Sequence, residues 1–376
     1  MWRTEDDIQR MLRNSAEDFA ASEHSLERFR KLRASETGFD PDAWKAMAQL
    51  GWTGILLPEE LGGAGLGLGP ALTLAEIFGR NLITEPFVPS AIISATILGC
   101  AGTRGKVLAE RLIEGRVTIC PAFQEKHDDA GFVQPECKLE GDSALVLNGT
   151  KIFAPGWVRG SPVLLSAIMG DQVVVILVAS GAEGVSIVER KMSDGTLSAD
   201  FRFSGVKVNH DEILLAGREA AMAIQLALAR GSLALAAQME GLAKKLHEMT
   251  VDYLQQREQF GKPLASFQVL RHAIVDLHMQ IELAGASWRH AASQLEGGGF
   301  EAAEGAIYAA LARCGQTALL LGKSAIQYHG AFGYTEDADI GLYSNAALRW
   351  ASQFGSPAGQ QGAALSWYKN WSRADA

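Results

Sequence analysis

Cysteine is scarce in this chain, and its cysteines are far apart. The 376 residues include only Cys100, Cys120, Cys137 and Cys314, and none of them forms a CxxC pair. This spacing argues against a disulfide framework and against a zinc site. A chain without structural disulfides suits a reducing compartment, so we expect a cytoplasmic protein that binds no metal.

Positive charge is also in deficit. The chain carries 34 basic and 43 acidic residues, which gives a formal net charge of −9. Binding of a nucleic-acid backbone therefore has no general electrostatic support, and we expect no nucleic-acid partner. We find no apolar run of the length of a membrane span, and the first residues are charged, so we expect neither a membrane association nor a secretory signal.

Several familiar functional motifs are missing as well. The sequence has no GxGxxG after a strand, no GxxxxGK[ST], no HExxH and no GxSxG. Their absence argues against Rossmann-type and P-loop nucleotide sites, zinc proteases and serine hydrolases of the elbow type. What is present is an ordinary globular composition, with 48% hydrophobic and 20% charged residues. Such a chain can bury a large core in two or three domains.

The periodicity of the first part predicts helices over residues 1–115. One helix start is well marked, because Asp40 can cap a helix in which Pro41 takes the first position. A glycine-rich loop follows, and we expect Gly79 and Pro86 to break up the next helical stretch.

The pattern changes twice further on. Residues 116–215 alternate between apolar and polar side chains and contain repeated Gly, Asp and Asn turns, which predicts a compact antiparallel β domain. Residues 216–376 are rich in strong helix formers and predict a helix bundle. The predicted fold class is α+β multidomain, with an N-terminal helical domain, a middle antiparallel β domain and a C-terminal helix bundle.

Three segments combine residues that suit a bound ligand. In the segment 257–263, an arginine is followed by an aromatic residue and a Gly-Lys-Pro turn, which suits an anionic ligand near a helix junction. An arginine favoured by the dipole at a helix C-terminus explains the same pattern. Phe267 and Gln268 come just past this turn. In the segment 327–335, small residues follow a helix and would allow a ligand to approach the backbone closely.

Together, these segments resemble the acyl-CoA dehydrogenase family of flavoproteins. YLQQREQFGKPLASFQVLRH is similar to the family signature RxQFGxPIxxFQ, and IQYHGAFGYT is similar to its Q-x-x-GGxGY/F segment. GWTGILLPEELGGAGLGL and LNGTKIFAPG resemble an N-terminal and a β-domain segment of the family. The order of the motifs and the helix–β–helix division match over nearly the whole chain. GRNLITEPF and FQVLRH are most similar to a bacterial branch that acts on steroid side chains and other bulky acyl-CoAs.

The resemblance implies a reaction, a cofactor and partners. The family dehydrogenates an acyl-CoA thioester between its α- and β-carbons, with a carboxylate base for the α-proton and FAD for the β-hydride. Electrons then pass to an electron-transfer flavoprotein. The flavin carries the redox chemistry, while the protein orients the reacting bonds and excludes water. We therefore expect FAD, an acyl-CoA substrate, an electron-transfer flavoprotein and an oligomeric assembly.

The resemblance also implies which residues bind FAD. One group would reach the pyrophosphate, in part across a subunit interface, and consists of Arg257, Gln259, Phe260 and Gln268. A second group would hold the adenine side and includes Gln327, His329 and Gly330. A third would line the isoalloxazine ring, unless its aromatic residues are plain core, and consists of Phe123, Gln124 and Phe153.

This chain departs from the family pattern at several of these positions. Phe153 stands for the usual tryptophan, and Pro155 stands for a threonine whose hydroxyl contacts the ring. Ala331 replaces the second glycine of the GG pair. Pro155 offers the ring neither a hydroxyl nor an N–H donor, so it cannot make the flavin contact of the usual threonine.

The usual catalytic glutamate is absent from both positions at which the family carries it. These positions hold Phe354 and Ala229, and neither side chain can take a proton. Losing a positioned general base typically removes about 10²–10⁴-fold in rate.

Three readings of the missing base remain open. A partner subunit of a hetero-oligomer supplies it; a homo-oligomer uses a relocated carboxylate; or the chain is a catalytically inactive subunit for assembly or acyl-CoA binding. Candidates for the relocated group are Glu336, Asp337 and Asp339, which also read as solvated loop charges. Arg230, beside Ala229, either contacts the CoA or acyl chain or is a helix-surface charge.

Overall fold

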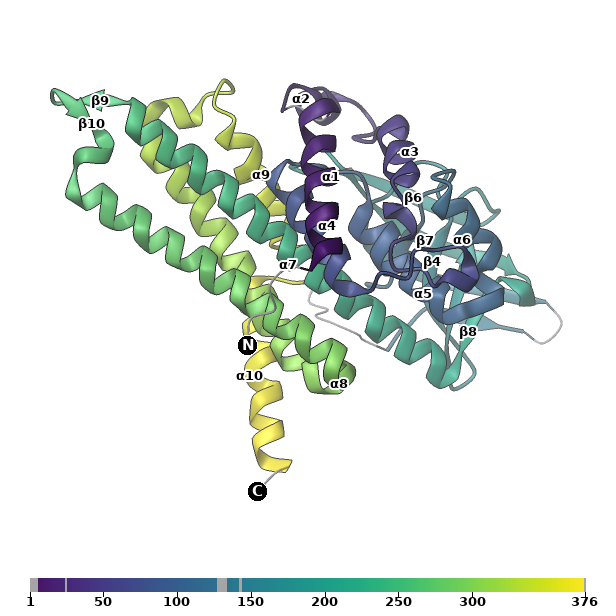
Figure 1. The fold of residues 1–376 in the computed structure, drawn as a ribbon. Coiled ribbons are helices and arrows are strands. Elements are labelled where there is room, and N and C mark those ends of the chain that lie inside the picture. Colours follow the sequence, from purple (N-terminus) through teal and green to yellow (C-terminus); the bar gives the residue numbers. More distant parts are fainter. Residues whose placement is uncertain (1–5, 24–25, 127–133, 142–143, 375–376) are drawn as a thin grey trace. The chain divides into compact units, whose positions relative to one another are not determined.

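The computed structural model describes residues 6–23, 26–126, 134–141 and 144–374, and Figure 1 draws it as a ribbon. Helices occupy the chain up to Ile113, strands run from Cys120 to Ala216, and helices follow from Gly217. The predicted fold class, α+β with N-terminal helices, a central sheet and C-terminal helices, is confirmed. The exact three-domain boundaries stay a prediction.

Packing groups the chain into two compact units. Unit 1 comprises residues 1–30, 72–83 and 232–376, and unit 2 comprises residues 31–71 and 84–231. Three helices run from one unit into the other: α2 (Leu26–Ala34), α4 (Leu68–Arg80) and α7 (Gly217–Gln256).

Unit 2 begins with short helices that the sequence marks well. Asp40 caps the first of them as predicted, because its carboxylate accepts hydrogen bonds from the backbone N–H groups of Asp42 and Ala43, and Pro41 takes the first position. The helical elements of this part are α3 (Pro41–Gln49), η1 (Trp52–Gly54), η2 (Glu59–Leu61), the π-helix η3 (Phe87–Ser94), α5 (Ala95–Ala101), η4 (Gly102–Gly105) and α6 (Lys106–Ile113).

The rest of unit 2 is built on an eight-stranded sheet. Its strand order is β6-β7-β3-β2-β4-β5-β8, and β1 pairs with β4. The strands are β1 (Cys120–Ala122), β2 (Lys138–Glu140), β3 (Leu145–Pro155), β4 (Val163–Met169), β5 (Gln172–Val178), β6 (Val185–Lys191), β7 (Leu197–Val208) and β8 (Ile213–Ala216), with η5 (His210–Glu212) before β8.

The sheet is mixed, whereas the sequence predicted an antiparallel one. Both β1 and β2 run parallel to β4, and the other pairings are antiparallel. Alternation along one strand reports only which side chains are buried, so it cannot reveal the direction of a neighbour that is distant in sequence. The core beneath the sheet includes fully buried Phe201, whose ring lies 6.2 Å from that of Phe203 and edge-on to Trp157.

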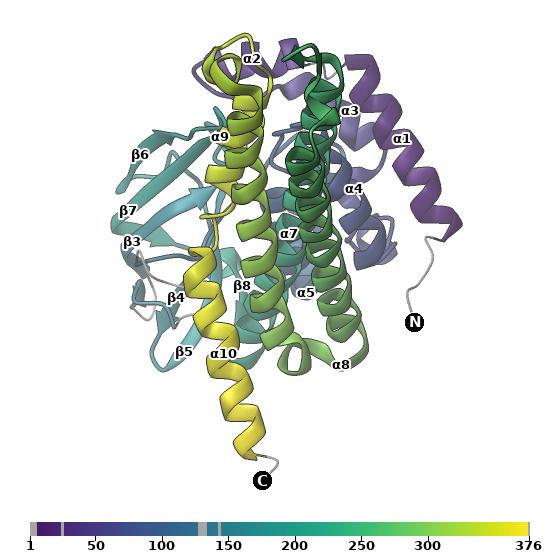
Figure 2. The same ribbon diagram turned by 90° about the vertical axis from the view of Figure 1, so that its left-hand side faces the viewer.

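Unit 1 contains the long C-terminal helices. Its largest element, α8 (Gln268–His329), is two helices joined at Gly299, whose φ of 75° and ψ of −172° are not helical. The two arms lie side by side (Figure 2), and Arg313 on the second arm donates to Gln280 on the first. The other elements are α1 (Asp7–Glu23), the hairpin β9 (Glu258–Gln259) and β10 (Lys262–Pro263), η6 (Leu264–Ser266), η7 (Gly330–Tyr334), α9 (Ile340–Trp350) and α10 (Pro357–Ala374).

Two glycines allow α4 and α7 to cross closely within unit 1. A Cβ atom on Gly79 would lie 1.9 Å from the carbonyl oxygen of Gln238, and a Cβ on Gly241 would lie 1.9 Å from that of Glu76. The predicted break between Gly79 and Pro86 is confirmed, since α4 ends at Arg80 and η3 begins after Pro86, although Gly79 itself lies in the last turn of α4. The glycine is needed for a contact distant in sequence, which a local pattern does not show.

The expectation about apolar runs also needs correction. By length and composition, two helical stretches are apolar enough to cross a membrane: Phe87–Ile113 and Gly217–Gln256. In each, 67% of the most apolar window is buried within the structure, as in the core helices of water-soluble proteins. That the protein has no membrane partner stays a prediction.

Candidate functional site

A cavity of about 520 Å³ in unit 1 brings together two segments that lie about 70 residues apart. One segment is the end of α7 with the following hairpin, and the other is the end of α8 with η7. The lining residues are Tyr253, Arg257, Gln259, Leu264, Gln327, Tyr328, His329, Gly330, Ala331 and Phe332. Five of the residues predicted to bind FAD are among them: Arg257, Gln259, Gln327, His329 and Gly330.

Arg257 provides a cation at this cavity. Helix α7 ends at Gln256, and the backbone of Arg257 is held on both sides, since its N–H donates to the carbonyl of Tyr253 and its carbonyl accepts from the N–H of Leu264, both at 2.8 Å. Among the described residues, its guanidinium has no hydrogen-bond or ion-pair partner. A free guanidinium beside backbone and amide groups suits a phosphate-bearing ligand.

His329 is the buried imidazole of the cavity. Its ring stacks on Tyr253 with 4.1 Å between the centroids, and the Tyr253 hydroxyl donates to the His329 carbonyl at 3.2 Å. Burial lowers the pKa of His329, so the ring is neutral at pH 7. Nδ1 lies 2.8 Å from the carbonyl oxygen of Ala325 and must donate its proton there, which leaves Nε2 as an acceptor.

Two residues of the predicted pyrophosphate group, Gln268 and Phe260, lie outside the lining of this cavity. Gln268 is exposed, with its amide 3.5 Å from His272. Phe260 is 90% exposed and sits at the tip of the β9–β10 hairpin, where it and Gly261 both have positive φ, as a two-residue type I′ turn requires. Asparagine suits this turn position far better than phenylalanine. An exposed aromatic residue in a disfavoured conformation is consistent with contact to another molecule.

In unit 2, the structure brings Gln124 and Phe153 together. Gln124 follows β1, and its carbonyl accepts a hydrogen bond of 2.8 Å from the N–H of Ile152, the residue before Phe153. Both predicted residues are half-buried, as is Phe123. Complete core packing is therefore not the role of Phe123 or Phe153, and each presents part of its ring outward.

Beneath this junction is an ion pair that sequence reasoning missed. Lys151 is fully buried, and its ammonium contacts the Glu125 carboxylate and, at 3.0 Å, the Ser166 hydroxyl. Burial raises the pKa of Glu125, but Lys151 and backbone N–H groups more than offset this and hold it below its usual value. The pair fixes the residues next to Gln124 and Phe153. The sequence signal for this pair was weak: Lys151 is a charged residue directly before the apolar residues 152–154.

The structure also describes the two positions at which the family carries its catalytic glutamate, Ala229 and Phe354. Ala229 is 2% exposed on α7, and the guanidinium of the neighbouring Arg230 lies 3.4 Å from the hydroxyl of buried Thr96. Arg230 is thus partly buried within unit 2, which does not match a plain surface charge. Phe354 is half-buried, and its carbonyl accepts from the buried Gln360 side chain.

The acidic candidates for a relocated base are solvated or paired. Glu336 and Asp337 are exposed. The carboxylate of Asp339 binds the Arg30 guanidinium at 2.7 Å, and the backbone carbonyl of Glu336 binds the same group at 2.7 Å. This loop therefore has the features of a surface ion-pair site.

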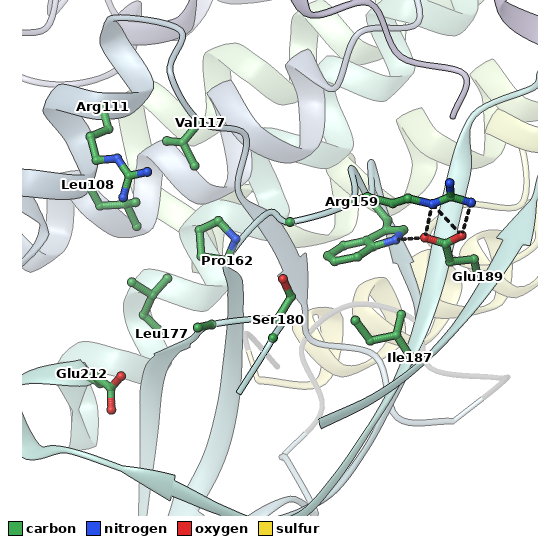
Figure 3. A pocket seen from close by; sticks show the side chains of 14 residues that line it. Leu108, Arg111, Val117, Arg159, Pro162, Leu177, Ser180, Ile187, Glu189 and Glu212 are labelled. Atoms are coloured by element: carbon green, nitrogen blue, oxygen red, sulfur yellow. Dashed lines mark hydrogen bonds and ion pairs between the residues drawn. The ribbon is translucent and has the colours of Figure 1, made fainter. Parts of the chain in front are cut away.

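Unit 2 contains a larger open cavity of about 900 Å³ that holds none of the predicted site residues. Figure 3 shows that Arg159 and Glu189 are engaged with each other: Arg159 makes several hydrogen bonds to Glu189, and the indole N–H of Trp157 donates to the same carboxylate at 2.8 Å. In the part of the chain that the structure describes, no cluster of three or more His, Cys, Asp or Glu side chains could hold a metal ion.

Two family models match this chain. The acyl-CoA dehydrogenase N-terminal domain matches residues 6–104, and the C-terminal domain of the same family matches residues 217–358. The chain belongs to the acyl-CoA dehydrogenase family, whose members are FAD-dependent CH–CH oxidoreductases.

Individual relatives match over most of their length. A 3-(aryl)acrylate reductase from Clostridium sporogenes is 28% identical over 357 residues, which covers 88% of this chain and 90% of the relative. The ChsE4–ChsE5 complex from Mycobacterium tuberculosis has a TM-score of 0.84 at 21% identity, with 96% of both chains covered. A glutaryl-CoA dehydrogenase from Mycobacterium smegmatis, solved in complex with FADH2, has a TM-score of 0.85 at 18% identity, with 96% of this chain and 95% of that chain covered. These two structural likenesses show the fold.

Proposed function

We propose that this chain is an FAD-binding subunit of an oligomeric acyl-CoA dehydrogenase, which introduces a double bond between the α- and β-carbons of an acyl-CoA thioester. The family membership supports the reaction class. The observation that carries the proposal is the unit 1 cavity, which Arg257, with no guanidinium partner among the described residues, lines together with Gln327 and the end of α8.

The donor set of this cavity fits FAD. A guanidinium and a side-chain amide suit a pyrophosphate, and the backbone at Gly330, with φ of 62°, is open to close approach because a Cβ there would meet nothing within 4 Å. The neutral His329 adds a hydrogen-bond acceptor. In unit 2, Phe153, Phe123 and Gln124 would line the flavin ring of an FAD whose pyrophosphate is reached in part across a subunit interface. When bound, FAD supplies the oxidant for the C–H bonds, and these residues bind and orient it.

The absence of the catalytic glutamate determines the role that we propose for this chain within the oligomer. Neither Ala229 nor Phe354 can accept the α-proton, and Asp339 is already paired with Arg30. We therefore propose that a second acyl-CoA dehydrogenase-like chain supplies the carboxylate. The two-chain ChsE4–ChsE5 relative supports such an arrangement. Electron transfer to an electron-transfer flavoprotein and a cytoplasmic location complete the proposal.

A second, non-catalytic function is favoured by the same two residues, Ala229 and Phe354, which replace the catalytic glutamate. A subunit without a base at either family position could serve only in assembly or acyl-CoA binding. Flavin content separates the two: the proposed enzyme subunit is yellow and its flavin is bleached by an acyl-CoA, whereas an assembly subunit is colourless.

The test is co-expression with a neighbouring dehydrogenase-like chain, followed by measurement of the FAD-to-chain ratio. The proposal predicts two FAD molecules per four chains and turnover with an artificial electron acceptor, run in both directions because the Clostridium relative is a reductase. One FAD per chain with strong turnover by the chain alone would contradict the partner role. Absence of flavin from every preparation would contradict the enzymatic role itself.

A further inference from the structure

Phe153 has a backbone conformation that its residue type disfavours. Its φ is 51°, and only two other non-glycine residues in the described chain, Leu82 and Phe260, have a positive φ. A side chain with a Cβ pays a steric cost in this region, and such strain gathers at functional sites. Because the ring is only half-buried, core packing alone does not offset that cost.

The strain arises at a bulge in the sheet. Lys151 pairs with Phe201 and Ala154 pairs with Ala199, so two residues of β3 face only one residue of β7, Asp200. Ile152 and Phe153 thus lose their ladder partners on β7. A β-bulge of this kind turns a side chain away from the regular alternation and is common beside active sites.

Asp200 and Arg190 replace the missing ladder interaction. The Asp200 carboxylate accepts a hydrogen bond of 2.9 Å from the N–H of Phe153, the group that the bulge leaves without a strand partner. Its other oxygen binds the guanidinium of Arg190, with Nε at 3.0 Å. The same guanidinium lies over one face of the Phe153 ring, 5.6 Å from its centroid. Backbone and ring of Phe153 are therefore fixed by one ion pair.

Two neighbouring residues of the edge strand β6 contact Phe153 and Trp157, at either end of the segment 153–157. Arg190 contacts the ring of Phe153, and its neighbour Glu189 binds Trp157 and Arg159 (Figure 3). Successive residues of a strand point to opposite faces, so one strand makes both contacts. The Glu189 contacts hold Trp157 and Arg159, whereas the Asp200–Arg190 pair contacts Phe153 directly.

We propose that Asp200 and Arg190 are positioning residues that hold the ring of Phe153 against the bound flavin. The inference rests on the proposed function, in which Phe153 lines the isoalloxazine ring. The guanidinium covers one face of the phenyl ring, so the remaining exposed part is presented to the ligand in one orientation.

The experiment uses the full chain reconstituted with FAD. The variants are D200A, which removes the acceptor for the Phe153 N–H, R190Q, which removes the charge and the ring contact, and F153G, which keeps the positive φ but removes the ring. E189Q is the matched control, because it weakens an ion pair of the same strand without touching Phe153. The readouts are the Kd for FAD, the fluorescence and absorption spectrum of bound flavin, and the thermal midpoint.

We expect D200A and R190Q to raise the Kd for FAD about tenfold, which corresponds to about 1.4 kcal/mol. The absorption spectrum of their bound flavin should shift toward that of F153G, since a displaced ring no longer keeps water from the isoalloxazine. The double variant D200A/F153G should bind FAD no more weakly than F153G alone. E189Q should lower the thermal midpoint and leave the flavin spectrum unchanged.

Two results would overturn the inference, and they differ. If D200A and R190Q lose stability as E189Q does but keep the wild-type flavin spectrum and Kd, the pair is only structural and the proposed function stands. If the wild-type chain binds no FAD in any preparation, both fail together. If D200A does not fold, the flavin spectrum and Kd of R190Q, compared with those of E189Q, test the positioning role.

Discussion

At the scale of single residues, Phe354 offers the sharpest test of the missing base. We expect F354E to raise acyl-CoA-dependent reduction of an artificial acceptor by about 10²–10⁴-fold in the flavin-loaded chain, because a carboxylate there can accept the α-proton. F354Q has the same size without a proton acceptor and should stay at the wild-type rate. Equal rates for F354E and F354Q across a panel of acyl-CoA thioesters would place the base elsewhere.

His329 makes the stability of the cavity depend on pH. Burial lowers its pKa from the usual 6.5, so the unfolded chain binds the proton more readily than the folded one. The stability that follows from keeping the ring neutral is complete above pH 6.5 and is lost as the pH falls through the lower, folded pKa. We expect the free energy of unfolding in urea to fall in this window for the wild type and to be flatter there for H329Q. The same slope in both would assign the dependence to other groups.

Some residue-level features were predictable and others were not. Asp40 caps its helix because Pro41 and a polar cap are local signals, and the Arg257 and Gln327 segments were recognised from short motifs. The left-handed conformation of Phe153 was not predictable, because it depends on pairing with β7, about fifty residues away. The Lys151–Glu125 pair was missed because its two members are 26 residues apart and meet only in the folded chain.

At the scale of elements, the crossing of α4 and α7 depends on two glycines. In an isolated helix, glycine costs about 0.5–1 kcal/mol relative to alanine, so G241A would be expected to stabilise. At this crossing, a Cβ would lie 1.9 Å from a carbonyl oxygen of α4, which cannot move without shifting a helix. We expect G241A to lower the free energy of unfolding by about 3 kcal/mol, at the upper end of overpacking effects.

Gly341 provides the control for this substitution. It lies within α9, and a Cβ there would meet nothing within 4 Å. G341A should therefore stabilise by about 0.5–1 kcal/mol, since only the propensity changes. Urea denaturation of both variants checks the pair, and a stabilised G241A would show that the helices do not cross as described. Sequence alone cannot separate these glycines, because a local pattern does not show which of them faces another helix.

At the scale of the whole molecule, unit 1 is joined by buried charges from four distant helices. Glu76 on α4 and Glu240 on α7 are nearly inaccessible, and Lys244 bridges them at 2.6 and 3.0 Å. Arg13 on α1 binds Glu76 at 3.2 Å, and Arg289 on α8 binds Glu240 at 3.3 Å. Of this cluster, only the Glu240–Lys244 pair, four residues apart on one helix, could be read from the sequence. The other members meet only because the helices pack.

Removing Lys244 tests whether this cluster holds unit 1 together. Burial raises the pKa of Glu76, but Lys244, Arg13 and Arg289 more than offset this and keep it below 4.5. Glu76 therefore stabilises the folded state above pH 4.5, and this stability is lost as the pH falls below that value. We expect K244M to cost about 3 kcal/mol at pH 7, because two buried carboxylates lose their shared cation.

The pH dependence of K244M distinguishes this cause from a simple packing defect. Without Lys244 the pKa of Glu76 rises, so the acid loss of stability should begin at a higher pH than in the wild type. The adjacent K245M, which removes a lysine with no described ion-pair partner, should keep both the stability and the pH profile within about 0.5 kcal/mol of the wild type. The double variant K244M/E76Q should recover part of the loss, because the cluster then buries one carboxylate fewer around its remaining arginines. If K244M unfolds at the wild-type urea midpoint at pH 7, the arginines alone suffice to neutralise both carboxylates, and the four helices are held by their apolar contacts.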